Sequence, residues 1–202
     1  MYCLPDGYVS QKPAVYVEGD DRVWQPDVYP FAAKIARLEG ATKLVDFGCS
    51  TAGKLVEFAD EFDVTGIDLP ATLPTSAVGT WIAQDLDSES KLPLGKNDFE
   101  NSVLICSDVI EHMDRPERLV AKLKGALRWA SCLVLSTPDR TRTRGADDMG
   151  PPANHCHARE WDADELVEWL ETEDLTVVEQ SWQRSYIGGP EATVVVVVKW
   201  VS

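Results

Sequence analysis

Short apolar runs alternate with stretches of helical periodicity along most of the chain, and this alternation predicts an α/β fold. Five short, mainly apolar runs have the length of buried strands: 43–46, 64–67, 80–83, 103–106 and 132–135. Helical segments lie between them, so we expect these strands to be parallel. Two further strands, 176–182 and 192–200, flank the turn sequence Gly188–Gly189–Pro190 and should form an antiparallel hairpin. The pattern predicts a mostly parallel, seven-stranded sheet with a C-terminal antiparallel hairpin.

Helices are predicted where apolar residues recur every three or four positions. The first runs from Val28, with Leu38 on its inner face, and stops at Gly40, a residue type that commonly ends helices. The second opens at Asp114, which has the character of an N-cap and precedes Pro116. The third follows the capping residue Asp162. No internal repeat interrupts this order, which is typical of one Rossmann-like domain.

The stretch from Lys43 to Lys54 joins the first strand to a predicted helix beginning near Leu55. Gly48 and Gly53 lie where a side chain would block positive φ or keep a ligand away from the backbone. Such a turn serves nicotinamide enzymes, nucleotide binders and methyltransferases, and it can also be purely structural. Taken alone, it leaves the ligand open.

Acidic residues at the ends of the next two strands narrow the choice of ligand for this turn. Asp68 closes the second strand, where a carboxylate can accept hydrogen bonds from a ribose diol, and Asp85 follows the third. Together with Asp46 they place three acceptors along one carboxyl edge, where open α/β sheets bind ligands. We therefore expect a nucleoside-bearing cofactor at this edge.

From about Val28 to its C-terminus the chain resembles the class I S-adenosylmethionine-dependent methyltransferases. The resemblance implies that Asp46 and Gly48 lie near the methionine part, that Asp68 holds the ribose, and that Asp85 with Leu86 meets the adenine. The family usually carries Gly where this chain has Ser50. The full set of cofactor-binding residues implied is Asp46, Gly48, Cys49, Ser50, Gly53, Lys54, Asp68, Leu69, Asp85, Leu86, Ser107 and Asp108.

Composition limits the size, location and partners of the protein. A chain of 202 residues builds one ordinary core, so we expect a single methyltransferase domain over 28–202, preceded by an arm or lid at 1–27. Within the arm, Trp24 and its neighbours could close on the cofactor or anchor the arm in the core. No membrane-length apolar run or signal sequence is present, and five scattered cysteines form no paired framework, so we expect a cytoplasmic protein.

The charge pattern bears on the methyl acceptor. A net charge of −15 repels phosphate backbones, so we expect no nucleic-acid partner and no membrane partner, but a small-molecule or glycan acceptor. Arg140, Arg142 and Arg144 form a basic island in a long loop. They could hold an anionic acceptor or could belong to a solvated surface. The oligomeric state is left open by the sequence.

A second set of candidate residues follows the fourth strand. If the chain turns helically there, Asp108, Glu111 and His112 fall at i, i+3 and i+4 and share one face. The loop after the fifth strand adds His155 and His157, and its parent strand should lie beside the fourth. These residues could equally support the following helix and cap its turn.

Methyltransferases of the ubiquinone-biosynthesis and small-RNA terminal 2′-O-methyl types resemble this chain here, with an acid-x-x-Glu-His run after the fourth strand. The small-RNA type adds a later His that His157 matches. The resemblance implies a divalent-metal site of Asp108, Glu111, His112 and His157, with Asp in place of the usual Glu at 108. Carboxylates and imidazoles without thiolate suit Mg²⁺, Mn²⁺, Fe²⁺ or Zn²⁺. We expect His112, His155, His157 and Asp108 to act in catalysis, His155 as a substrate contact or base.

A narrower resemblance involves 25–29, 150–154 and 159–161, which are similar to bacterial methyltransferases among surface-glycan and secondary-metabolite enzymes. It implies a sugar or glycosyl-phosphate acceptor. The sequence therefore predicts an O-methyltransferase acting on a small hydroxylated acceptor, with possible assistance from a metal. Two alternatives are a nicotinamide-dependent oxidoreductase and a non-catalytic S-adenosylmethionine-binding module.

Overall fold

The computed structural model describes residues 21–75 and 78–200, and it confirms the predicted sheet. Seven strands lie in the order β3-β2-β1-β4-β5-β7-β6, with the first five parallel and the last two antiparallel to their neighbours. Their bounds are β1 Lys43–Phe47, β2 Asp63–Asp68, β3 Thr80–Ala83, β4 Ser102–Ser107, β5 Cys132–Pro138, β6 Thr176–Arg184 and β7 Glu191–Lys199.

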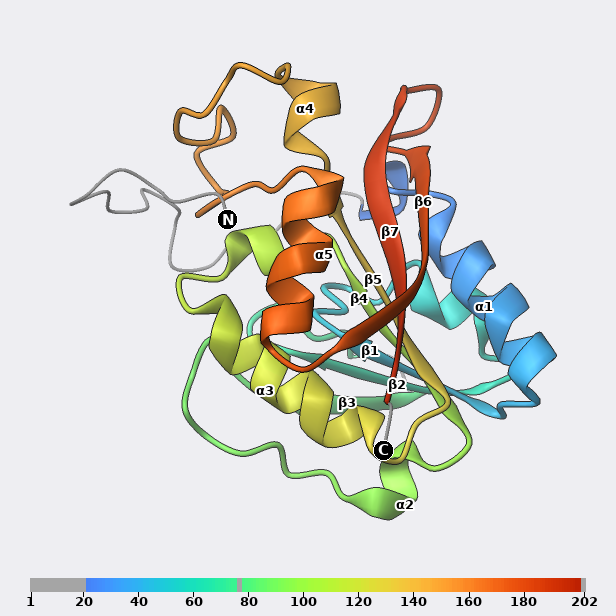
Figure 1. The fold of residues 1–202 in the computed structure, drawn as a ribbon. Helices are drawn as coiled ribbons and strands as arrows, with labels where there is room; N and C mark the ends of the chain where they lie inside the picture. The colour runs from blue at the N-terminus through green and yellow to red at the C-terminus, as the bar shows by residue number, and fades with distance from the viewer. Residues whose placement is uncertain (1–20, 76–77, 201–202) are drawn as a thin grey trace.

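Helices cover both faces of this sheet, and this explains why its central strands are apolar throughout. Val103 and Ile105 of β4 pack on the face covered by α1 (Val28–Glu39), while Leu104 and Cys106 face α3 and α5 (Figure 1). The bounds of the latter two are Pro116–Leu127 and Ala163–Thr172. Alternation along each strand thus divides the core into two layers.

The helix ends follow the sequence with two differences. Gly40 ends α1 in the left-handed conformation as expected, but Leu38 is exposed and Ala36 is buried instead. The predicted inner face is wrong at that position, because the helix presents its small alanines to the sheet. Asp114 is not the N-cap of α3: Asp87 accepts hydrogen bonds from the backbone N–H groups of Asp114 and Arg115.

After β1 the predicted helix is replaced by a single 3₁₀ turn, η2 (Leu55–Phe58). Further short elements are η1 (Asp21–Val23), α2 (Lys96–Phe99) and η3 (Ile110–His112). The loop after β1 therefore does not lead into the long helix whose N-terminus binds the pyrophosphate in dinucleotide enzymes. This difference weakens the oxidoreductase alternative.

The long segment after β5 is held in place by its arginines. It begins with α4 (Arg140–Thr143) and lies at the end of the sheet where β4 and β5 finish (Figure 1). Arg140 is buried against Asp162 and Glu165, Arg142 lies 4.2 Å above the Trp182 ring, and Arg144 reaches the carbonyl groups of 150 and 151. All three arginines of the basic island thus make internal contacts that hold the loop.

The described part of the N-terminal arm, residues 21–27, pairs with the tip of the β6–β7 hairpin. Gln25 N–H donates to the Ser185 carbonyl, and Ile187 N–H donates to the Val23 carbonyl. An ion pair between Asp27 and Arg184 strengthens this junction. Residues 1–20 of the arm lie outside the described residues. No helix in the described ranges has the length and apolar character needed to cross a bilayer.

Asp139 should be the main support of the segment after β5. Its buried carboxylate accepts hydrogen bonds from the Thr141 and Arg142 N–H groups, the Thr141 hydroxyl and the Trp182 indole. We expect Asp139→Ala to lower the free energy of unfolding by about 2–4 kcal/mol, measured by urea denaturation. Thr143→Ala, an exposed change on the same helix, should cost under about 0.5 kcal/mol. Equal losses in the two variants would contradict this role.

Candidate functional site

A cavity of 330 Å³ opens at the carboxyl edge of the parallel strands. It is lined by ten of the twelve residues that the sequence assigned to the cofactor: Gly48, Cys49, Ser50, Lys54, Asp68, Leu69, Asp85, Leu86, Ser107 and Asp108. These residues come from the ends of β1, β2, β3 and β4, so the parallel topology collects them. The remaining two, Asp46 and Gly53, are not among the lining residues.

The loop after β1 is shaped by left-handed backbone and by close packing. Gly48 has φ of 89°, and a Cβ there would lie 2.3 Å from a Val109 methyl group. Ser50 and Ala52 also have positive φ, at 50° and 58°. Ser50 therefore adopts the backbone conformation favoured by the glycine that the family usually carries at this position, at a steric cost of about 1 kcal/mol.

Asp68 connects this loop to the second strand. Its two carboxylate oxygens accept hydrogen bonds from the backbone N–H groups of Ser50, at 2.7 Å, and Leu69, at 2.6 Å. The carboxylate keeps lone pairs in addition to these two bonds, and it lines the cavity. It can therefore fix the loop and accept ribose hydroxyls at the same time.

Asp46 plays a structural part in this arrangement. It is fully buried, and its carboxylate accepts a 2.6 Å hydrogen bond from the Tyr29 hydroxyl of α1. Tyr29 itself lines the cavity, and the Lys54 ammonium lies 4.9 Å from the centre of its ring. Asp46 thus orients Tyr29, which forms part of the cavity wall, without lining the cavity itself.

Sequence reasoning missed Gln25. Its buried side chain donates from Nε2 to Asp108 at 2.5 Å and accepts at Oε1 from Ser136, at 2.5 Å, and Ser107, at 3.2 Å. One amide thus bridges the carboxyl ends of β4 and β5. The only hint in the sequence was the concentration of hydrogen-bonding groups in 24–29, and no local pattern indicates a partner more than 80 positions away.

The sequence left open whether Trp24 lies over the cofactor site or anchors the arm in the core, and its position in the structure favours the first interpretation. It lines the cavity, is 39% exposed, and meets the Tyr186 ring edge-on at 5.9 Å. Its carbonyl accepts a hydrogen bond from the Lys54 ammonium. It is therefore part of the cavity wall and not a core anchor.

The charges that line the cavity indicate which sign of charge its ligand should carry. Five carboxylates line it, and among the described lining residues Lys54 is the one lysine or arginine. The carboxylates are those of Asp68, Asp85, Asp87, Asp108 and Asp114. Such a surface attracts a sulfonium and repels a pyrophosphate. The cavity is therefore suited to a positively charged donor and unsuited to a nicotinamide dinucleotide.

Next to this cavity, Glu111, His112 and His157 form a compact cluster. One possible ligand atom from each lies within 4.8 Å of the others. Glu111 and His112 come from η3, and His157 comes from the long loop after β5. The loop is attached to η3 because the Glu111 carbonyl accepts hydrogen bonds from the backbone N–H groups of Ala158 and Arg159.

Hydrogen bonds orient both imidazoles. His112 Nδ1 lies 2.9 Å from the Cys156 carbonyl oxygen, and His157 Nδ1 lies 2.7 Å from the Glu160 carboxylate. Both partners can only accept, so each ring carries its proton on Nδ1 and its lone pair on Nε2. The rings meet edge to face, with centroids 4.9 Å apart.

Within the cluster, Glu111 is the group whose ionised form is least favourable. It is fully buried, and among the described residues neither of its carboxylate oxygens has a hydrogen-bond partner of acceptable geometry. Burial raises the pKa of Glu111 well above its ordinary value, and the nearby Asp108 charge raises it further. A buried acceptor of this kind is suited to a cation.

Of the other two residues predicted for catalysis or metal binding, Asp108 lies next to Glu111 but is not one of the three residues whose ligand atoms come together, and His155 lies apart. Asp108 lines the donor cavity with a φ of 60°, and its carboxylate accepts from Gln25. His155 is exposed on the loop and is not among the cavity-lining residues. The structure thus brings three of the four predicted metal ligands together.

A family model described as a methyltransferase domain matches residues 16–180. The chain belongs to this methyltransferase family. It is an S-adenosylmethionine-dependent methyltransferase. No curated protein matches the chain in sequence.

Solved structures share the fold of this methyltransferase. The methyltransferase domain of bacterial CtHen1 is 18% identical, with a TM-score of 0.59 over 87% of this chain and 100% of that one. The glycopeptide N-methyltransferase MtfA, bound to S-adenosylhomocysteine, is 14% identical, with a TM-score of 0.63 over 92% and 90%. Magnesium protoporphyrin IX methyltransferase from Synechocystis PCC 6803, also bound to S-adenosylhomocysteine, is 17% identical, with a TM-score of 0.57 over 87% and 83%.

Asp68→Ala should weaken S-adenosylmethionine binding at least tenfold, measured by calorimetric titration. The change removes the proposed acceptor of the ribose hydroxyls and the partner of Ser50 N–H, and each unsatisfied buried group costs about 1–3 kcal/mol. Asp68→Asn keeps one acceptor oxygen and should lose less affinity. Unchanged affinity in Asp68→Ala would show that the ribose lies elsewhere.

Glu111→Gln should stabilise the metal-free protein, and more so as the pH rises. Folded wild-type protein keeps the buried Glu111 protonated while the unfolded chain ionises it, so stability is lost as the pH rises from the unfolded pKa of about 4.3 to the raised folded pKa. The loss amounts to about 1.4 kcal/mol for every pH unit of that interval. Urea denaturation in EDTA at pH 5 and pH 8 should show the gain growing with pH. Glu117→Gln, which removes an exposed carboxylate, should show no such growth.

Proposed function

We propose that the protein methylates a hydroxyl group of a small acceptor carrying vicinal hydroxyls, with a divalent cation held by Glu111, His112 and His157. The observation that carries this proposal is the cluster itself, in which a fully buried carboxylate lies beside two oriented imidazoles. Its member His112 also lines the donor cavity. The cluster is therefore placed to meet an acceptor that reaches the methyl group.

The residues fit a cation in type and size. Carboxylate and imidazole ligands suit Mn²⁺, Fe²⁺ or Zn²⁺, and Mg²⁺ to a lesser degree. The possible ligand atoms of the three residues lie within 4.8 Å of one another, which is close enough for one cation with ligand distances of about 2.0–2.2 Å to contact all three after small side-chain adjustments. Three protein ligands leave positions for acceptor oxygens. When bound, the cation would favour the ionised form of an acceptor hydroxyl.

The other residues of the site would position the reactants. Gln25 holds the Asp108 carboxylate at the cavity wall, where it can accept a hydrogen bond from the donor or the acceptor. Trp24 closes the side next to Lys54, whose ammonium can pair with the donor carboxylate. Methyl transfer depends mainly on in-line placement of the two reactants, which these contacts would provide.

The charges favour a neutral acceptor such as a sugar or a hydroxylated secondary metabolite. The three arginines that could have held an anion make internal contacts, and Asp87 and Asp114 line the cavity. The small RNA methyltransferase HEN1 is one of the proteins with a similar fold. We expect RNA to be a poor acceptor for this chain, because its net charge is −15.

Metal analysis and methyl-transfer assays test this proposal. Protein purified without chelator should contain a divalent cation, and Glu111→Gln should lower Mn²⁺ affinity about 100-fold, measured by electron paramagnetic resonance. With labelled S-adenosylmethionine, a pyranoside with vicinal hydroxyls should accept the methyl group, and its analogue lacking one hydroxyl should not. EDTA should abolish transfer and Mn²⁺ should restore it. Full activity of metal-free protein, or faster transfer to an amine or to RNA, would overturn the proposal.

A further inference from the structure

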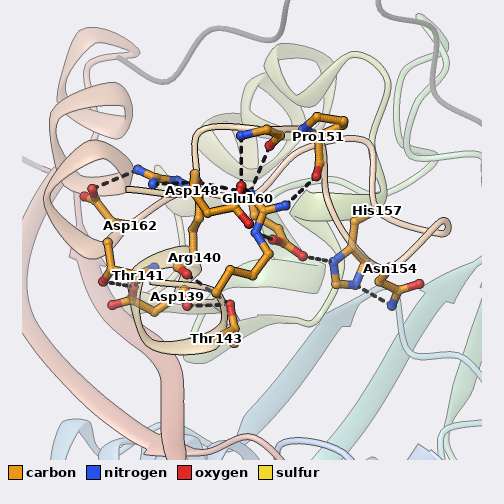
Figure 2. A network of polar contacts seen from close by, with 12 residues as sticks. Asp139, Arg140, Thr141, Thr143, Asp148, Pro151, Asn154, His157, Glu160 and Asp162 are labelled. Carbon is orange, nitrogen blue, oxygen red and sulfur yellow. Dashed lines mark hydrogen bonds and ion pairs between the residues drawn. The ribbon is translucent and has the colours of Figure 1, made fainter. Parts of the chain in front are cut away.

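Behind His157 lies a chain of buried charges that neither the family nor the proposed reaction accounts for. The Arg144 guanidinium is 3.2 Å from one carboxylate oxygen of Glu160, and the other oxygen accepts from His157 Nδ1. The side chains of Arg144 and Glu160 are only 8% and 6% exposed. Figure 2 shows Glu160 beside the arginines on one side and His157 on the other.

The far side of the imidazole is also fixed. Asn154 Oδ1 accepts a hydrogen bond from the Cys156 backbone N–H, so its amide NH₂ must point toward His157, where it lies 3.0 Å from Nε2 (Figure 2). An NH₂ group can only donate, which requires a lone pair on Nε2. Both neighbours of His157 therefore demand the same neutral tautomer, with the proton on Nδ1.

We propose that Arg144 is a positioning residue that acts through Glu160 to hold His157 in the Nδ1-protonated tautomer. Arg144 pairs with the buried Glu160 carboxylate and fixes its position, and Glu160 then accepts the hydrogen bond from the Nδ1–H of His157. Nε2 is left with its lone pair, which accepts a hydrogen bond from the Asn154 amide. A cation would take this lone pair in place of the Asn154 amide.

Two features suggest that Arg144 does more than stabilise the loop. Arg140, one helical turn earlier, already attaches the loop through Asp162, Glu165 and the Asp148 carbonyl. Arg144 repeats the attachment at the carbonyls of Gly150 and Pro151, yet its Nε also lies 3.2 Å from Glu160 Oε2, as an ion pair without hydrogen-bond geometry. Carboxylate partners of this kind commonly orient metal-binding histidines, and losing one typically costs about 10–100-fold in metal affinity.

The inference rests on the proposed cation site for its purpose, but the tautomer can be measured without metal. The chain has only three histidines, so their ring nitrogens can be resolved in ¹H–¹⁵N correlation spectra of labelled, metal-free protein. Wild-type His157 should show the pure Nδ1-protonated pattern. Glu160→Gln, which is nearly isosteric, and Arg144→Met should give a mixture of tautomers, and Arg144→Lys should restore most of the wild-type pattern.

Arg140→Lys is the matched control, because it weakens ion pairs of another buried arginine of the same loop, which involve Asp162 and Glu165 instead of Glu160. It should lower thermal stability and leave the His157 spectrum unchanged. Mn²⁺ affinity should fall at least tenfold in Glu160→Gln and Arg144→Met only. An unchanged tautomer in Glu160→Gln would overturn the inference. A changed tautomer in a protein that binds no Mn²⁺ would instead overturn the cation site and leave the positioning role standing.

Discussion

Parallel strands joined by crossovers must end at the same edge of the sheet, and every functional side chain of this protein depends on that constraint. Sharp turns of the chain at that edge require backbone conformations with positive φ. Four of the six described non-glycine residues with positive φ lie there: Gln25, Ser50, Ala52 and Asp108. Strain of about 1 kcal/mol or more at each position is thus concentrated where the cofactor binds, and the buried layers on both faces of the sheet must offset it.

The sequence was sufficient for features that depend on local pattern. Strand 80–83 agrees with β3 residue for residue, and the capping box between Asp162 and Glu165 starts α5 where expected. Ten of the residues that the family resemblance implied for the cofactor line the cavity, and most of them lie at or just after a strand end. Periodicity, capping and strand ends are properties of neighbouring residues, and a single sequence displays them.

The features that were missed depend on partners distant in the sequence. Asp87 caps α3 from another loop, and Gln25 bridges strands more than 80 residues away. For the arginines of the loop the sequence leaves open whether they hold an anion or belong to a solvated surface, because their partners Asp162, Glu165 and Glu160 lie up to 25 positions further on. Local composition cannot distinguish a solvated charge from a buried, paired one. The predicted helix after β1 also failed, because the chain turns back after a single 3₁₀ turn to enter β2.

The acidic cavity has a consequence for the direction of the reaction. Five carboxylates in its lining and the buried Glu111 repel one another, so positive charge on a ligand relieves an unfavourable field. S-adenosylmethionine brings such a charge on its sulfonium, and methyl transfer removes it by leaving a neutral thioether. The same field that favours binding of the donor therefore favours release of the product. A cation on Glu111, His112 and His157 would not be lost in this step, so it could remain between turnovers while the donor is exchanged.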